Sequence, residues 1–147
     1  MHPYPHRYVV DAAAASPTGA VTIDAEGLPT IESQPPPEFD GPGGFWSPEA
    51  LLVAAVADCF ILTFRSIARA AHFEWQGLSC RVEGVLERAS GGTQFTRYTT
   101  RARLRAPRGV DRDKARELLE RSEKLCLIAN SLRGERLLEI EVIEAEP

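Results

Sequence analysis

The sequence SPEALLVAAVADCF at residues 47–60 decides the fold, because it marks the start of a long apolar helix that carries a cysteine. Ser47 is a suitable N-cap, since its hydroxyl can accept a hydrogen bond from a first-turn amide. Pro48 suits the first helical position, where its fixed φ is helical and its missing N–H is not needed. The run continues without Gly or Pro to Ala71, which predicts a helix of about 24 residues or ~36 Å. Because this helix is apolar on nearly every side until Arg65, we expect it to be buried in a core.

Length and composition indicate an ordinary globular protein. The chain has 147 residues, 44% of them hydrophobic and 26% charged, which suits one domain spanning residues 1–147. The net charge is −4, from 17 basic and 21 acidic residues. This balance argues against nucleic acid or an anionic membrane as the main partner. Asp58 and the many alanines of the apolar run also argue against a membrane-spanning helix.

The N-terminal residues and the spacing of the cysteines indicate the cellular compartment in which the protein is located. Residues 1–7 contain no apolar segment of a secretory signal, and residues 1–6 are expected to be flexible. The three cysteines are widely spaced and form neither a disulfide framework nor a zinc pattern. We therefore expect a cytoplasmic protein with free thiols and no metal site.

Hydrophobic periodicity predicts an α+β fold. Short apolar runs between Pro and Gly indicate a β-meander before the long helix, and alternating residues after it indicate a β-hairpin. An amphipathic second helix, capped by Asp111, and a closing strand complete the chain. The expected elements are a meander at 7–31, a long helix at 48–71, strands at 79–88 and 93–106, a helix at 112–129 and a strand at 137–143.

The loop at 32–46 is rich in proline and glycine and ends at Phe45 and Trp46. Three consecutive prolines followed by glycines predict an extended loop. Its two aromatic side chains could form the wall of a substrate pocket together with Phe60. An equally good interpretation is that one of them fastens the start of the helix to the core.

Two of the cysteines could meet. A buried cysteine such as Cys59 is most often a core residue. However, Cys126 lies on the apolar side of the second helix, so the two thiols would face each other if the helices pack together. Facing thiols permit a cycle in which one is oxidised and the other forms a disulfide with it. Cys80, on a strand, has no such partner and is interpreted as structural or incidental.

These residues resemble a known family. WSPEALLVAAVADCF at 46–60 looks like the signature N/S-P-E-x-L-L-x-A-A-x-A-x-C-F of the OsmC/Ohr family, the osmotically inducible and organic hydroperoxide resistance proteins. CLIANSLRG at 126–134 looks like the family's second-cysteine segment, which is usually Cys-Pro-x-Ser-Asn-Ala. The order of elements matches from about residue 7 to 144, so the resemblance covers nearly the whole chain.

The resemblance implies a fold and an activity. The implied fold is an intertwined homodimer with its long helices packed centrally between two sheets. The implied activity is reduction of organic hydroperoxides, with Cys59 as the peroxidatic thiolate and Cys126 as the resolving thiol. A dithiol or lipoyl-type reductant would then reopen the disulfide, and no metal or haem cofactor is implied.

The chain departs from the family pattern at two places. In the family, an arginine of the N-terminal hairpin, paired with the acid at the position of Glu49, favours the thiolate, but residues 12–19 contain no arginine. Either Arg65, Arg69 or an arginine from a partner subunit replaces it, with Arg7 the nearest candidate upstream, or Cys59 is a poorly activated thiol. The second departure is Leu127, which stands in place of proline. We expect it to let the second helix continue past Cys126.

Two alternative functions remain open. One is a non-catalytic protein that binds a small molecule on the same fold, which the missing arginine favours. The other is a purely structural or interaction dimer. Retention of both Cys59 and Cys126 favours the peroxidase over these two alternatives.

Overall fold

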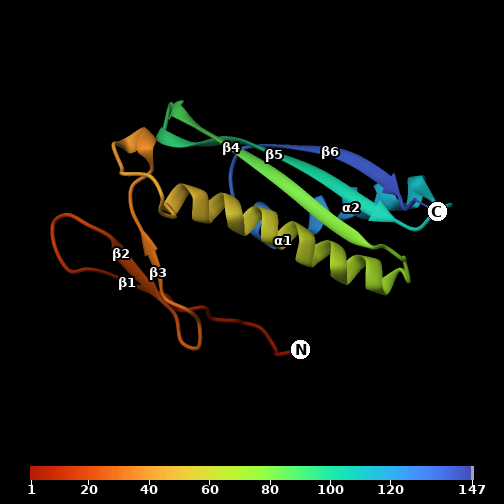
Figure 1. Ribbon diagram of the computed structural model, residues 1–147, viewed down its shortest axis with the longest axis horizontal. Coiled ribbons are helices and arrows are strands. Elements are labelled where there is room, and N and C mark those ends of the chain that lie inside the picture. The colour runs from red at the N-terminus through yellow and green to blue at the C-terminus, as the bar shows by residue number, and fades with distance from the viewer. Residues whose placement is uncertain (147) are drawn as a thin grey trace. The chain divides into compact units, whose positions relative to one another are not determined.

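The computed structural model describes residues 1–146. The chain forms two compact units, one spanning Met1–Leu51 and the other beginning at Leu52, and each is described by itself. Figure 1 labels the strands and the helices α1 and α2. In chain order they are β1 (Asp11–Ala14), β2 (Val21–Asp24), β3 (Ile31–Ser33), η1 (Pro37–Phe39), α1 (Pro48–Ala70), β4 (Gly77–Ala89), β5 (Gly92–Ala106), α2 (Arg112–Leu125), α3 (Leu127–Asn130) and β6 (Glu135–Glu144).

The N-terminal unit contains the predicted meander. Strands β1, β2 and β3 form an antiparallel sheet in that order. After β3 the proline-rich loop makes the short 3-10 turn η1 and then runs alongside the strand, where the Gln34 N–H donates to the Trp46 carbonyl at 3.0 Å. The loop is therefore tied to the sheet by a backbone hydrogen bond.

The second unit is built on a three-stranded sheet in the order β4-β5-β6. Strands β4 and β5 form the predicted antiparallel hairpin, with a bulge between Val85 and Leu86. Strand β6 pairs parallel to β5, because α2 and α3 carry the chain back across the sheet before β6 begins (Figure 1). The α+β arrangement that the sequence predicts is thus present.

One face of this sheet carries the core. Alternate residues of β5, such as Ala102 and Leu104, are buried, whereas the arginines between them are exposed. The buried side packs against Phe60 and Phe64 of α1 and against Leu118 of α2. Both helices therefore pack against the same face of the sheet and reach one common core.

Helix α1 begins as predicted, with the Ser47 hydroxyl accepting from the Ala50 N–H at 3.1 Å. Its buried residues are Val56, Phe60, Phe64 and Ala68, which are spaced by four and form a single stripe. By length and composition the helix could cross a membrane, a property it shares with core helices of soluble proteins, and only 17% of its apolar window is buried within the chain. The expected burial is therefore reached on one stripe only.

The second helix does not continue past Cys126, so the expectation based on Leu127 is wrong. Helix α2 ends at Leu125, and Cys126 adopts an extended conformation with φ −63° and ψ 104° before the short helix α3 begins. The Asn130 side chain donates to the Lys124 carbonyl at 3.0 Å. Because side chains satisfy the carbonyls at its end, α2 can stop without a proline.

Candidate functional site

The site is built around Cys59, in the middle of α1. Its neighbour in the chain, Phe60, is 1% exposed and belongs to the core, whereas Cys59 is half-buried. The Cys59 sulfur lies 3.8 Å from the Thr63 hydroxyl, one helical turn further along. Cys59 is thus held on a rigid element with its thiol at the edge of the core.

Cys126 lies at the break between α2 and α3. The side chain is 1% exposed, and its carbonyl accepts from the Asn130 N–H at 2.9 Å, the hydrogen bond that starts α3. The extended backbone at this position therefore orients the thiol inward while the next helical turn begins.

The environment of Cys126 keeps its thiol protonated. Burial raises its pKa to about 11, and a hydrogen bond and charge interaction with Cys59 act in the same direction. The backbone N–H groups of Ala129 and Ile128 oppose this rise only in part. The structure thus places Cys59 near Cys126, although the two residues come from different elements.

Arg136 of β6 holds the segment around Cys126. Its Nε donates to the Glu123 carboxylate at 2.6 Å, and it also donates to the Glu123 carbonyl. A further N–H of Arg136 donates to the Asn130 side chain at 2.7 Å. The two ion-pair side chains are only 25% and 19% exposed. One guanidinium therefore connects the end of α2 to α3, on either side of Cys126.

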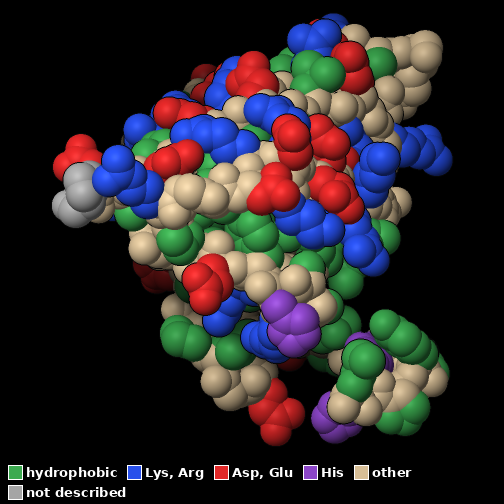
Figure 2. Space-filling view, turned by 90° about the vertical axis from the view of Figure 1, so that its right-hand side faces the viewer, with side chains coloured by type: hydrophobic (Ala, Val, Ile, Leu, Met, Phe, Trp, Pro, Cys, Tyr) green, Lys and Arg blue, Asp and Glu red, His purple; other side chains and the backbone are tan. Residues whose placement is uncertain are grey.

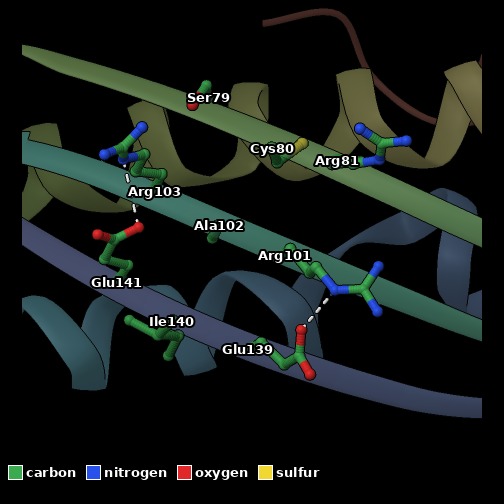
Figure 3. Close-up of a pocket in the computed structure, with 9 residues that line it drawn as sticks. All are labelled: Ser79, Cys80, Arg81, Arg101, Ala102, Arg103, Glu139, Ile140 and Glu141. Carbon is green, nitrogen blue, oxygen red and sulfur yellow. Dashed lines mark hydrogen bonds and ion pairs between the residues drawn. The ribbon is translucent and has the colours of Figure 1, made fainter.

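Cys80 is separate from this pair. Its sulfur donates to the Ala57 carbonyl of α1 at 3.4 Å, and its pKa is raised by burial and, to a smaller extent, by Asp58. Cys80 also borders a shallow hollow of about 500 Å³ on the sheet. Figure 3 shows the charged side chains around this hollow and the sulfur turned toward the helix. The contacts of Cys80 agree with a structural role.

The outer face of the sheet is covered by paired charges. Arginines of β5 lie beside glutamates of β6 in parallel register, and Figure 2 shows basic and acidic side chains interleaved over the face that it presents. The pairs are Arg97–Glu135 at 3.2 Å, Arg101–Glu139 at 2.6 Å and Arg103–Glu141 at 3.2 Å. All are well exposed, so each contributes little to stability.

The other predicted site residues lie at several places. Phe45 and Trp46 are 44% and 51% exposed on the loop of the N-terminal unit. Arg7 is exposed before β1, and Arg65 is exposed on α1. Among residues 1–146 no group of His, Cys, Asp or Glu side chains is arranged to hold a metal ion.

Glu49 has the most unusual surroundings of the predicted residues. One of its carboxylate oxygens, Oε2, is buried and has no hydrogen-bond partner among the described residues. Burying a carboxylate oxygen without a donor is unfavourable. The sequence places Glu49 in the first turn of a helix, where an acidic residue is favourable. The sequence does not indicate that one oxygen of this side chain is buried.

Comparison with known proteins places these observations in a family. Residues 41–141 match the family model described as OsmC-like protein. The chain is similar to "Uncharacterized protein YmaD" of Bacillus subtilis (strain 168), with 27% identity over 123 residues, 82% of this chain and 81% of the relative.

Solved structures share the fold. The OsmC-like protein of unknown function VCA0330 from Vibrio cholerae superposes with a TM-score of 0.84 and 21% identity, covering 93% of this chain and all of that one (100%). A structure from Legionella pneumophila, described as an organic hydroperoxide resistance protein OsmC, gives a TM-score of 0.75 and 22% identity, covering 96% and 99% of the two chains.

Proposed function

Because the chain belongs to the OsmC-like protein family, we propose that it is a thiol peroxidase that reduces organic hydroperoxides. One observation supports this proposal: Cys59 lies near enough to Cys126 to raise the pKa of the Cys126 thiol, although segments far apart in the sequence supply the two residues. The description of the Legionella relative as an organic hydroperoxide resistance protein supports the choice of substrate class.

The proposed cycle has three steps. The Cys59 thiolate attacks the terminal oxygen of R–O–O–H, the O–O bond breaks, and protonation of the alkoxide releases R–OH while Cys59 becomes a sulfenic acid. The Cys126 sulfur then attacks the Cys59 sulfur, forming a disulfide and releasing water. A dithiol, such as a lipoyl group, reduces this disulfide by exchange and is itself oxidised to a disulfide.

The surroundings of the two thiols support this division of roles. Cys126 is 1% exposed and its pKa is about 11, so at neutral pH it is a protonated thiol. Cys59 is the more accessible of the two. A peroxide would therefore meet Cys59 first, and Cys126 would act second.

A cationic group is proposed to assist the Cys59 thiolate. From Leu52 to residue 146 no guanidinium forms a hydrogen bond with the Cys59 sulfur. The assisting residue is proposed to be Arg65, Arg7 or an arginine of a partner subunit.

The proposed active form is a homodimer in the cytoplasm. Three free cysteines suit a reducing compartment. Outside its buried stripe, α1 carries further apolar residues, and Leu62 is 51% exposed. A second copy that packs against this face would complete the burial that the sequence of α1 predicts.

The first test is a count of free thiols. Reduced protein receives one equivalent of an organic hydroperoxide, and its thiols are counted and its peptides mapped. We expect the count to fall from three to one, with a Cys59–Cys126 disulfide, while Cys80→Ser protein forms the same disulfide. Three thiols that survive prolonged exposure would exclude the proposed cycle.

A second candidate function is binding of a small molecule without catalysis. A pocket of about 360 Å³ in the N-terminal unit favours it. The two candidates differ in their predictions, because a binding protein would keep its thiols when a hydroperoxide is added.

A further inference from the structure

The pocket of the N-terminal unit is preformed. It lies between the proline-rich loop, strand β2 and the first turn of α1, with Val21, Pro35, Pro36, Phe39 and Pro48 as its apolar lining. Its volume of about 360 Å³ is near the lower end of the range for small-molecule sites and suits a ligand of about one ring.

The loop that forms one wall has little freedom. The Phe39 and Gly41 N–H groups both donate to the Pro36 carbonyl, at 2.8 and 3.0 Å. A Cβ atom at Gly41 would lie 1.6 Å from the Pro35 carbonyl oxygen, so the loop can close in this way only with glycine there. Proline and these hydrogen bonds fix the wall before a ligand arrives, which lowers the entropic cost of binding.

One polar atom of the pocket lacks a partner. Glu49 Oε2 is buried without a hydrogen bond among the described residues. Ser33, which is 5% exposed, also lines the pocket and places its hydroxyl group in the same wall. Gln34 differs from Glu49, because its amide, once oriented to match its neighbours, donates to the Gly19 carbonyl at 3.2 Å and accepts from the Ala20 N–H at 3.1 Å.

The chemistry of the pocket selects its ligand. An apolar ligand without a polar group would leave the buried Glu49 Oε2 without a hydrogen bond, and the carboxylate would repel an anion. A cationic group could donate to Glu49 in a charge-assisted hydrogen bond and to the Ser33 hydroxyl oxygen as well. We propose that this pocket binds a small organic cation, an ammonium or guanidinium group carried on an apolar body that contacts the prolines and Phe39.

The inference goes beyond the thiol chemistry, and its test uses no peroxide. Benzylammonium, benzyl alcohol and benzoate have similar shapes and carry a positive, a neutral and a negative group. Each is titrated into the reduced full-length protein, and binding is followed by calorimetry and by amide NMR shifts. We expect millimolar binding of benzylammonium, about tenfold weaker binding of benzyl alcohol and no binding of benzoate.

Matched variants identify the group that binds. Glu49→Gln should weaken benzylammonium binding about tenfold and abolish its preference over benzyl alcohol, and Ser33→Ala should weaken it several-fold. Glu38→Gln is the control, because Glu38 is exposed on the same loop and does not line the pocket.

Three results would overturn the proposal. The first is equal affinity of the wild-type protein for benzylammonium and benzyl alcohol. The second is a Glu38→Gln variant that loses as much affinity for benzylammonium as Glu49→Gln does. The third is no binding of benzylammonium to wild-type protein, which is expected if an arginine of a second copy fills the pocket. The comparison of the three ligands on wild-type protein decides the question even if Glu49→Gln does not fold.

Discussion

The two thiols of the candidate site have different surroundings although they lie near each other. Cys126 is buried and has a pKa of about 11, whereas Cys59 is half-buried on a helix. A thiol must lose its proton before it can attack a sulfenic acid. The slow step of the proposed cycle should therefore be disulfide formation, with Cys126 limiting it.

This difference predicts a pH dependence. Because the pKa of Cys126 is raised, its thiolate fraction is small at neutral pH and grows about tenfold with each pH unit until the pH approaches that pKa. We expect the rate of Cys59–Cys126 disulfide formation to rise about tenfold per unit between about pH 7 and 10. It is measured by quenching samples with a sulfenic-acid trap at successive times after one peroxide pulse.

Cys126→Ser provides the control for this experiment. Its sulfenic acid at Cys59 should persist and react fully with the trap at every pH. A rate of disulfide formation in wild-type protein that does not change over this pH range would contradict the proposed role of the Cys126 proton.

At the scale of elements, the break after α2 is a feature that the sequence pattern does not predict. The apolar spacing from Leu118 to Ala129 is helical throughout, and no proline interrupts it. The helix nevertheless ends at Leu125, because the Asn130 and Arg136 side chains donate hydrogen bonds to carbonyls at its C-terminal end. Arg136 comes from a strand further along the chain, and local periodicity cannot show such a contact.

Other elements follow from local rules and were predictable. The start of α1 depends on Ser47 and Pro48, which act within one helical turn. The second half of strand β5, residues 100–106, depends on alternation, with exposed arginines on one side and buried small or apolar residues on the other. The Cys126 turn and the buried Glu49 oxygen depend on contacts between residues distant in sequence, and local patterns do not predict them.

The network of Arg136 gives a prediction at this scale. Arg136→Met keeps the apolar stem but removes the hydrogen bonds to Glu123 and Asn130, so the segment around Cys126 should become mobile. We expect disulfide formation to slow by about tenfold while sulfenic acid formation at Cys59 changes less than about twofold, since a positioning contact affects only the step that uses it. Both rates come from the same trapping experiment.

Arg103→Met is the matched control. Arg103 also pairs with a glutamate of β6, at 3.2 Å, but both side chains are more than half exposed. This variant should leave both rates unchanged. If Arg136→Met slowed both steps equally, Arg136 would support the stability of the unit in general and not the position of Cys126.

At the scale of the whole molecule, α1 is more apolar than one chain requires. Its stripe from Val56 to Ala68 meets the sheet and α2, and Leu62, on another side of the helix, stays 51% exposed. The sequence predicts full burial of this helix from its composition, and the single chain provides only part of it. The remaining apolar surface is the physical reason to expect a second copy.

The exposed face of α1 therefore gives the last prediction. Burying a leucine is worth about 2 kcal/mol, and placing a carboxylate in an apolar interface costs more, so Leu62→Glu should convert a dimer to monomers at micromolar concentration. Light scattering after size exclusion measures the mass of each. Leu125→Glu is the control, because Leu125 is equally exposed, at 52%, but lies on α2, and this variant should remain dimeric. A wild-type protein that is monomeric at every concentration, or a Leu62→Glu variant that stays dimeric, would show that α1 is not the contact between copies.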